Sequence, residues 1–158
     1  MKPDEIAALL VEKFGTGILE SKSDGLLPFG VVEPAGIVDV CAFVRYDERL
    51  QMDHLECLSG VDYQDRIEVV YTVYSMKHRH RYTLKVRLPR ENPKVHTVES
   101  FWGVANWHER EAFDLLGVVF EGHSDLRRIL CPDDWEGHPL RKDYTFPKSY
   151  RDMPVWEV

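Results

Sequence analysis

The residues that could carry chemistry are densest between His108 and Tyr144. Histidines, carboxylates and arginines in this stretch could bind a metal ion, exchange protons or capture charged groups. His108-Glu109 could open the His-Glu-x-x-His pattern of zinc proteases, in which both histidines lie on one face of a helix. The position that needs the second histidine holds Ala112, so the ligand set is incomplete. We therefore predict no zinc-protease chemistry.

The remaining metal-binding residue types are scattered. His123 and His138 each follow a glycine and have no set of His, Cys or Asp at ligand spacing. Cys41, Cys57 and Cys131 lie far apart and form no Cys-x-x-Cys pair, which indicates neither a disulfide framework nor an iron–sulfur or zinc site. Glycine-rich phosphate loops and Gly-x-Ser-x-Gly are also missing from the sequence. We expect no catalytic residue, cofactor or metal site in this chain.

What the stretch does contain is charge held between apolar residues. Arg127-Arg128 and Arg141-Lys142 are cationic pairs, and apolar residues such as Leu126 and Ile129 lie beside them. Repeated glycine and proline exclude a long helix or strand, while the apolar content is too high for a disordered tail. The pattern predicts a long extended arm whose arginines capture carboxylates of a partner with paired hydrogen bonds. The alternative is a solvated surface loop.

Composition restricts the class of protein. The 158 residues are 44% hydrophobic and 30% charged, as in one ordinary globular domain. A net charge of −7 speaks against nucleic acid as a partner. No apolar run approaches the ~20 residues of a membrane helix. Asp4 and Glu5 stand where a secretory signal would be positive, so we expect a cytoplasmic location.

Hydrophobic periodicity predicts the elements that position the arm. Helical spacing predicts helices at residues 4–14, 34–46 and 97–116, and alternation predicts strands at residues 18–21, 29–33, 54–61, 67–76 and 82–88. This order predicts an α+β fold in which helices cover one face of a mostly antiparallel sheet. Residues 1–117 are expected to form the α+β domain, and residues 118–158 an extended C-terminal docking arm. Arg110 and Asp114, four residues apart on the last helix, could pair.

The stretch also resembles a known family. Glu109-Arg110-Glu111, Asp114, Gly117, Phe120, Gly122-His123 and the run from Asp125 to Leu130 match the signature of the C subunit of proton-pumping NADH:quinone oxidoreductase, respiratory complex I. A second block, Trp135 to Tyr144, matches as well. Ser124 and Thr145 stand where the family usually has proline, which leaves the charged set unchanged.

The resemblance implies a non-catalytic scaffold protein in the hydrophilic arm of the complex, on the cytoplasmic side of a bacterial inner membrane. It implies a hetero-oligomer in which the chain packs against the D subunit, which holds the quinone site, and lies near the cluster-bearing B subunit. FMN, the iron–sulfur clusters and quinone would belong to the complex and not to this chain. Association with the membrane would be indirect, through the complex.

The arm's charged and aromatic residues are the expected partner interface: Glu109, Arg110, Glu111, Asp114, His123, Asp125, Arg127, Arg128, Trp135, His138, Arg141, Lys142 and Asp143. Two other functions stay open at this point. The chain could be the equivalent component of a complex-I-like membrane-bound hydrogenase, or a free-standing binding module for acidic ligands.

Overall fold

The computed structural model describes residues 1–155, and its order of elements confirms the expected α+β class. The helices are α1 (Pro3–Phe14), α2 (Ile37–Tyr46) and α3 (Ala105–Leu116), with short 3-10 turns η1 (Gly15–Gly17) and η2 (Pro34–Gly36). The strands are β1 (Ile18–Lys22), β2 (Phe29–Val32), β3 (His54–Asp62), β4 (Arg66–Tyr74), β5 (Arg81–Pro89), β6 (Lys94–His96), β7 (Val119–Glu121), β8 (Ser149–Tyr150) and β9 (Met153–Pro154).

The main sheet has five strands in the order β1-β2-β5-β4-β3. Every neighbouring pair is antiparallel except β2 and β5, which confirms a mostly antiparallel sheet. The parallel pair follows from the connection. The chain leaves β2, crosses through α2 to the far edge at β3, and returns by two hairpins, so that β5 runs beside β2 in the same direction.

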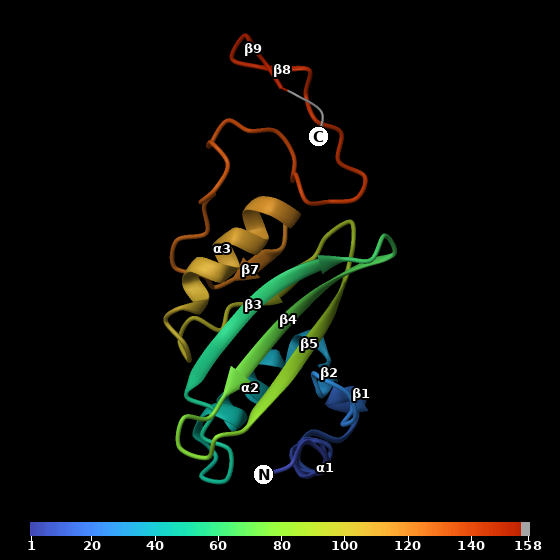
Figure 1. Cartoon of the computed structure of the whole chain (residues 1–158), viewed down its shortest axis with the longest axis vertical. Helices are drawn as coiled ribbons and strands as arrows, with labels where there is room; N and C mark the ends of the chain where they lie inside the picture. Colours follow the sequence, from blue (N-terminus) through green and yellow to red (C-terminus); the bar gives the residue numbers. More distant parts are fainter. Residues whose placement is uncertain (156–158) are drawn as a thin grey trace.

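The core lies between one face of this sheet and the helices. Alternate residues of β4, namely Val69, Tyr71 and Val73, are fully buried and contribute to the same cluster as Leu10 of α1 and Val44 of α2. Figure 1 shows the long strands β3, β4 and β5 crossing the middle of the molecule, with α2 and α3 on the same side of them. The sheet and α3 therefore form a continuous support for the C-terminal arm.

The last helix is shorter than its apolar spacing predicts. We expected it to begin near Thr97, whereas α3 begins at Ala105. The residues between form turns, in which the Trp102 amide donates to the Val98 carbonyl. Both side chains are buried, and the Trp102 indole N–H donates to the Met52 carbonyl at 3.0 Å. The apolar residues of this segment are spaced so that a non-helical turn packs on the core. That spacing resembles the spacing of buried residues in a helix.

The C-terminal arm begins inside the folded body. Its first strand, β7, pairs in parallel with β6, which lies in a segment to which the sequence assigned neither helix nor strand. Val118 and Phe120 have exposed fractions of 0% and 1%. After Glu121 the arm has little regular structure until the small antiparallel hairpin β8–β9.

The arm and the N-terminus lie at opposite ends of the molecule (Figure 1). The turn between β3 and β4 reaches toward the arm, and the β8–β9 hairpin lies farthest from α1. None of the helices formed by residues 1–155 is long and apolar enough to cross a membrane.

Candidate functional site: the C-terminal arm folded onto helix α3

The arm covers the last carbonyl groups of α3. A helix leaves about four carbonyls at its C-terminal end without partners inside the helix. Three donors from the arm reach them: His138 Nδ1 to the Asp114 carbonyl at 2.9 Å, the Leu140 amide to the Leu115 carbonyl at 3.0 Å, and Arg141 Nε to the Leu116 carbonyl at 2.7 Å. Positive charge at this end also interacts favourably with the helix dipole. The arm therefore supplies hydrogen-bond donors to the carbonyl groups at the end of α3.

The side chain of Asp114 holds the middle of the arm. One carboxylate oxygen accepts hydrogen bonds from the consecutive amides of Ile129, Leu130 and Cys131 at 3.0, 2.7 and 2.8 Å. The other accepts from the Arg128 guanidinium at 2.6 Å. Burial by itself would raise the pKa of Asp114, but these donors lower the pKa to about 2. The carboxylate is thus ionised and shapes the arm's backbone.

Arg128 directs its guanidinium into the chain. Besides Asp114, it donates to the backbone carbonyls of Trp135 at 2.8 Å and Gly137 at 2.9 Å. Only 15% of the side chain is exposed. We expected Arg128 to capture a carboxylate of a partner, whereas its paired hydrogen bonds close a loop of the arm on α3.

Arg110 also binds the arm and does not pair with Asp114. Its Nε and Nη2 donate to the carbonyls of Arg127 and Arg128 at 3.2 and 3.1 Å. The guanidinium lies 5.3 Å from the ring centroid of Trp107 on the preceding turn of α3. The pairing of Arg110 with Asp114 that the helical spacing suggested is wrong, because Arg128 occupies the carboxylate.

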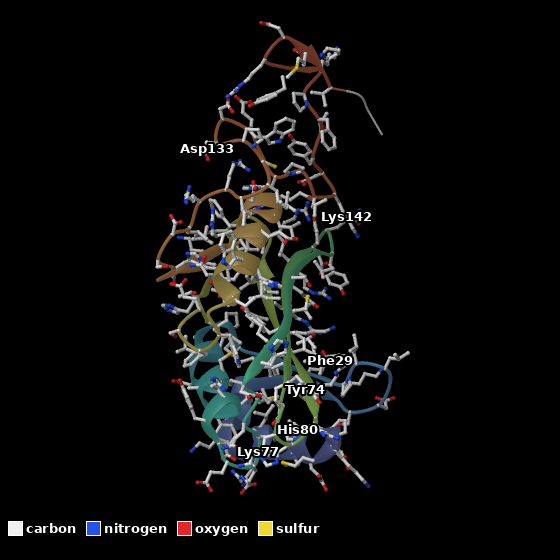
Figure 2. All side chains as sticks on the ribbon, turned by 60° about the vertical axis from the view of Figure 1, so that its left-hand side comes forward. Phe29, Tyr74, Lys77, His80, Asp133 and Lys142 are labelled. Atoms are coloured by element: carbon white, nitrogen blue, oxygen red, sulfur yellow. The ribbon has the colours of Figure 1, made fainter. Side chains whose placement is uncertain are left out.

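A second carboxylate ties the arm to the sheet. Asp62, at the end of β3, accepts the Lys142 amide at 2.8 Å and also a hydrogen bond from Arg90. Arg90 in turn donates to the Asp143 carboxylate at 2.6 Å. Burial alone would raise the pKa of Asp62, but the amides of Lys142 and Gln64 and the Arg90 guanidinium lower it. Figure 2 shows Lys142 beside the end of the sheet, with Asp133 on the opposite side of the arm.

Two glycines permit this close packing. Gly117 ends α3 with φ +74°, and a Cβ there would lie 2.5 Å from His138 Nε2 and 2.8 Å from Arg141 Nη2. The position therefore needs glycine both for its backbone and for the arm above it. At Gly60 of β3, a Cβ would collide with Leu116 Cδ1, so α3 rests directly on the strand.

A buried acidic group joins the start of the arm to the segment before α3. Glu109 is fully buried and accepts hydrogen bonds from the Val98 amide at 2.8 Å and from the Thr97 hydroxyl. Burial raises the pKa of Glu109 to about 7 although these donors favour the ionised form. The fully buried His123 ring places Nε2 3.9 Å from Glu109 and 3.7 Å from Glu99. His123 Nε2 lies 3.1 Å from the Asn106 backbone carbonyl of α3, so this ring fastens the arm to the helix.

The far end of the arm forms an open pocket beside two aromatic rings. The Trp135 and Tyr150 rings lie 5.1 Å apart, and Asp134 binds both the Tyr150 hydroxyl and the Arg151 guanidinium. The pocket has a volume of about 300 Å³. Within residues 1–155 the buried indole N–H of Trp135 has no acceptor.

The expected interface residues divide by exposure. Those buried or mostly buried inside the chain are Glu109, Arg110, Asp114, His123 and Arg128. Those half-buried are Trp135, His138 and Arg141. Those exposed are Glu111, Asp125, Arg127, Lys142 and Asp143. The structure thus brings all of them to α3 and the arm, and it uses the buried set in contacts within the chain.

Sequence reasoning missed the role of Asp62 and Arg90. The only signal was an acidic residue directly after the apolar end of a strand, and such residues usually begin a turn. Asp62 does so through the Gln64 amide at 2.9 Å, while its other oxygen binds an amide 80 residues away in the sequence. Nothing in local spacing indicates that second contact. Across the described part of the chain, no group of three or more His, Cys, Asp and Glu residues could hold a metal ion.

Comparison of the sequence with known proteins identifies relatives of this chain. Residues 31–150 match the family described as respiratory-chain NADH dehydrogenase, 30 Kd subunit. The NADH-quinone oxidoreductase C subunit of Chloroherpeton thalassium is 47% identical over 158 residues, which cover 98% of this chain and 66% of that protein. The C subunit of Chlorobium phaeobacteroides is 42% identical over 148 residues, or 91% of this chain and 89% of that one. The chain thus spans about two thirds of the first relative's length.

Solved structures show the same fold. The trypsin-resistant fragment of Nqo5 is 30% identical with a TM-score of 0.65, over 77% of this chain and 98% of the fragment. A chain in the membrane-bound sulfane sulfur reductase, an archaeal respiratory membrane complex, is 25% identical with a TM-score of 0.75, over 90% of this chain and 85% of that chain.

Proposed function

Because the chain belongs to the respiratory-chain NADH dehydrogenase 30 Kd subunit family, we propose that it is the C subunit in the hydrophilic arm of a proton-translocating NADH:quinone oxidoreductase. Such a complex passes electrons from NADH through FMN and iron–sulfur clusters to quinone. The observation that carries the proposal is the family match over residues 31–150, which includes both carboxylates that hold the C-terminal arm, Asp62 and Asp114.

The chain acts in this proposal as a non-catalytic scaffold. Its buried charged groups are used in hydrogen bonds that shape the chain: Asp114 and Arg128 close the arm, and Asp62 fastens it to the sheet. FMN, iron–sulfur clusters and quinone are held by other subunits. This chain contributes a fixed surface against which those subunits assemble.

The proposed partners are the D and B subunits of the same complex, on the cytoplasmic side of the cell membrane, with only indirect attachment to the membrane. The arm is the proposed docking element because it lies at one end of the molecule and carries the exposed leucines Leu130 and Leu140, at 64% and 60%. Large exposed apolar side chains often mark contact sites when they form a patch.

An affinity purification tests this function. A tagged copy of the chain is expressed in its own organism, and the complex is purified from mild-detergent extracts of membranes, with subunits identified by mass spectrometry. We expect NADH-oxidising, cluster-bearing and quinone-site subunits in fixed ratio to the tagged chain. A monomeric chain that recovers none of them would support a free-standing binding module instead.

The likeness to the sulfane sulfur reductase chain supports a second candidate, the equivalent component of a complex-I-like membrane enzyme such as a hydrogenase. The same purification separates the two. The first function requires NADH-oxidising subunits and NADH:quinone reductase activity in the purified complex. Recovery of hydrogenase-type or sulfur-reducing subunits without them would support the second.

A further inference from the structure

One face of α3 stays open between the two places where the arm is fastened. Trp107, Glu111 and Leu115 follow one another at intervals of one helical turn, so they form a single stripe on the helix. Trp107 is 60% exposed, Glu111 is exposed, and Leu115 is half-buried. The stripe therefore has one aromatic, one acidic and one aliphatic residue facing outward.

Two leucines of the arm flank this stripe. The Leu130 amide binds the Asp114 carboxylate, and the Leu140 amide binds the Leu115 carbonyl, so both residues are held against α3 through their backbones. Their side chains are nonetheless 64% and 60% exposed. We call the surface formed by Trp107, Glu111, Leu115, Leu130 and Leu140 the α3 face.

A shallow groove continues the α3 face toward the sheet. Its volume is about 50 Å³, and it is lined by β3, α3 and Leu140. Gly60 contributes no side chain there. The His108 ring fills the strand edge, because its Nδ1 lies 3.3 and 3.2 Å from the backbone nitrogen and oxygen of Leu58. This contact opposes the addition of another strand to β3, so the groove suits the side chains of a partner.

The arginines around this face are already occupied within the chain. Arg127 pairs with Asp125 at 2.9 Å, and Arg128 pairs with Asp114 at 2.6 Å. Arg141 donates to a carbonyl of α3. The Glu111 side chain, in contrast, makes no hydrogen bond or ion pair with any residue from 1 to 155. The face thus offers a partner apolar area and a single carboxylate.

We propose that the α3 face docks an aliphatic surface of another subunit of the complex, which brings one arginine or lysine against Glu111. This rests on the proposed function, and it assigns the contact to leucine, tryptophan and one acidic residue in place of the arm's arginines. Tryptophan and well-packed aliphatic side chains often dominate binding energy at interfaces, and a desolvated carboxylate requires an opposite charge.

Matched variants in the tagged chain test the face. Leu130→Asp and Leu140→Asp place a charge where an aliphatic contact is proposed, and Glu111→Arg reverses the single charge. Leu26→Asp and Glu91→Arg make the same changes at exposed positions elsewhere, and Leu26 is 100% exposed in the loop between β1 and β2. Thermal melting of each isolated variant confirms that the fold is retained.

We expect each variant of the α3 face to reduce co-purified complex subunits about tenfold or more, while the two controls stay within about twofold of the unaltered chain. A photo-crosslinker at position 111 should capture an aliphatic segment of another subunit with an arginine or lysine. Replacing that residue with glutamate should restore assembly of Glu111→Arg.

Three results would overturn the inference. If the folded variants co-purify as well as the controls, the face makes no contact that matters for assembly. If the crosslink joins two copies of this chain, the occupant is a second copy. If even the unaltered chain recovers no component of a respiratory complex, the proposed function fails together with the inference. If only the variants behave like the controls, the inference alone fails.

Discussion

At the scale of single residues, Asp114 is the group on which the arm depends most. Its carboxylate has no exposed surface and gathers three amides and one guanidinium. If the carboxylate is removed, water cannot reach this buried site to accept hydrogen bonds from the four donors.

We expect Asp114→Asn to lower the free energy of unfolding at neutral pH by about 2–3 kcal/mol, because an amide cannot accept all four donors without placing its own N–H groups against them. Asp125→Asn, which breaks the exposed pair with Arg127, should cost about 1 kcal/mol or less. Urea unfolding measures both. The pKa of Asp114 is lowered, so its contribution is present above the ordinary pKa of 3.8 and is lost as pH falls toward about 2. The difference between the unaltered chain and Asp114→Asn should therefore shrink in acid.

Glu109 should give the opposite pH dependence. Its pKa is raised from 4.5 to about 7, so its favourable contribution is complete below about pH 4.5 and is lost as pH rises through 7. Glu109→Gln keeps an oxygen for the Val98 amide but does not ionise. Between about pH 5 and pH 8 the unaltered chain should lose up to about 3 kcal/mol of stability relative to Glu109→Gln. Parallel stability curves would show that Glu109 is ionised throughout.

At the scale of elements, the contact between the C-terminus of α3 and the arm depends on one glycine. Gly117→Ala forces a Cβ into the space of His138 and Arg141 at a backbone with φ +74°. We expect a loss of about 2 kcal/mol or more, because both a left-handed conformation and the covering of the helix end are affected. Gly103→Ala, where a Cβ would meet nothing within 4 Å, is the control and should change stability by about 0.5 kcal/mol or less. Urea unfolding compares the two.

The arm itself should divide into a protected and an unprotected part in the isolated chain. The amides of Ile129, Leu130, Leu140 and Lys142 donate to acceptors on α3 and β3, so their hydrogen exchange should be slow. Over residues 145–148 no amide donates a hydrogen bond to any described residue, and exchange should be fast. Fast exchange throughout the arm would mean that it folds onto α3 only after a partner binds.

At the scale of the whole molecule, the arm's arginines stabilise the chain that carries them, which has a consequence for assembly. If docking is mainly apolar, raising NaCl from about 0.05 M to about 0.5 M should weaken association with the complex by less than about threefold, since salt screens exposed charges and not apolar contact. Capture of partner carboxylates by Arg127 and Arg141 would predict a loss of about tenfold or more. Co-purification at increasing salt measures the difference.

The arm lies at one end of an elongated molecule. The N-terminal helix and the β8–β9 hairpin lie at opposite ends of the molecule (Figure 1), and α1, the sheet and α3 share one core. A partner at the arm would therefore lie at the end of the molecule opposite α1.

The sequence by itself determined the fold class and the family. The alternation of Val69, Tyr71 and Val73 with other residues predicted a strand with one buried face. All three are buried, because every second side chain of a strand points to the same face of the sheet. The signature from Glu109 to Leu130 indicated the family because it fixes several residue types at set spacing. The predicted start of the last helix at Thr97 was wrong, because residues of a turn that packs on the core have the spacing of a helix.

Only the tertiary structure decided what the charged residues of the arm bind. Arg128 and Asp114 are 14 residues apart, and Lys142 and Asp62 are 80 apart, so no local period relates them. A sequence shows that an arginine is present, but the direction of its guanidinium depends on which carbonyls and carboxylates the fold leaves without partners. Here the end of α3 and two buried carboxylates supply those acceptors, while Leu130 and Leu140 of the same arm stay exposed.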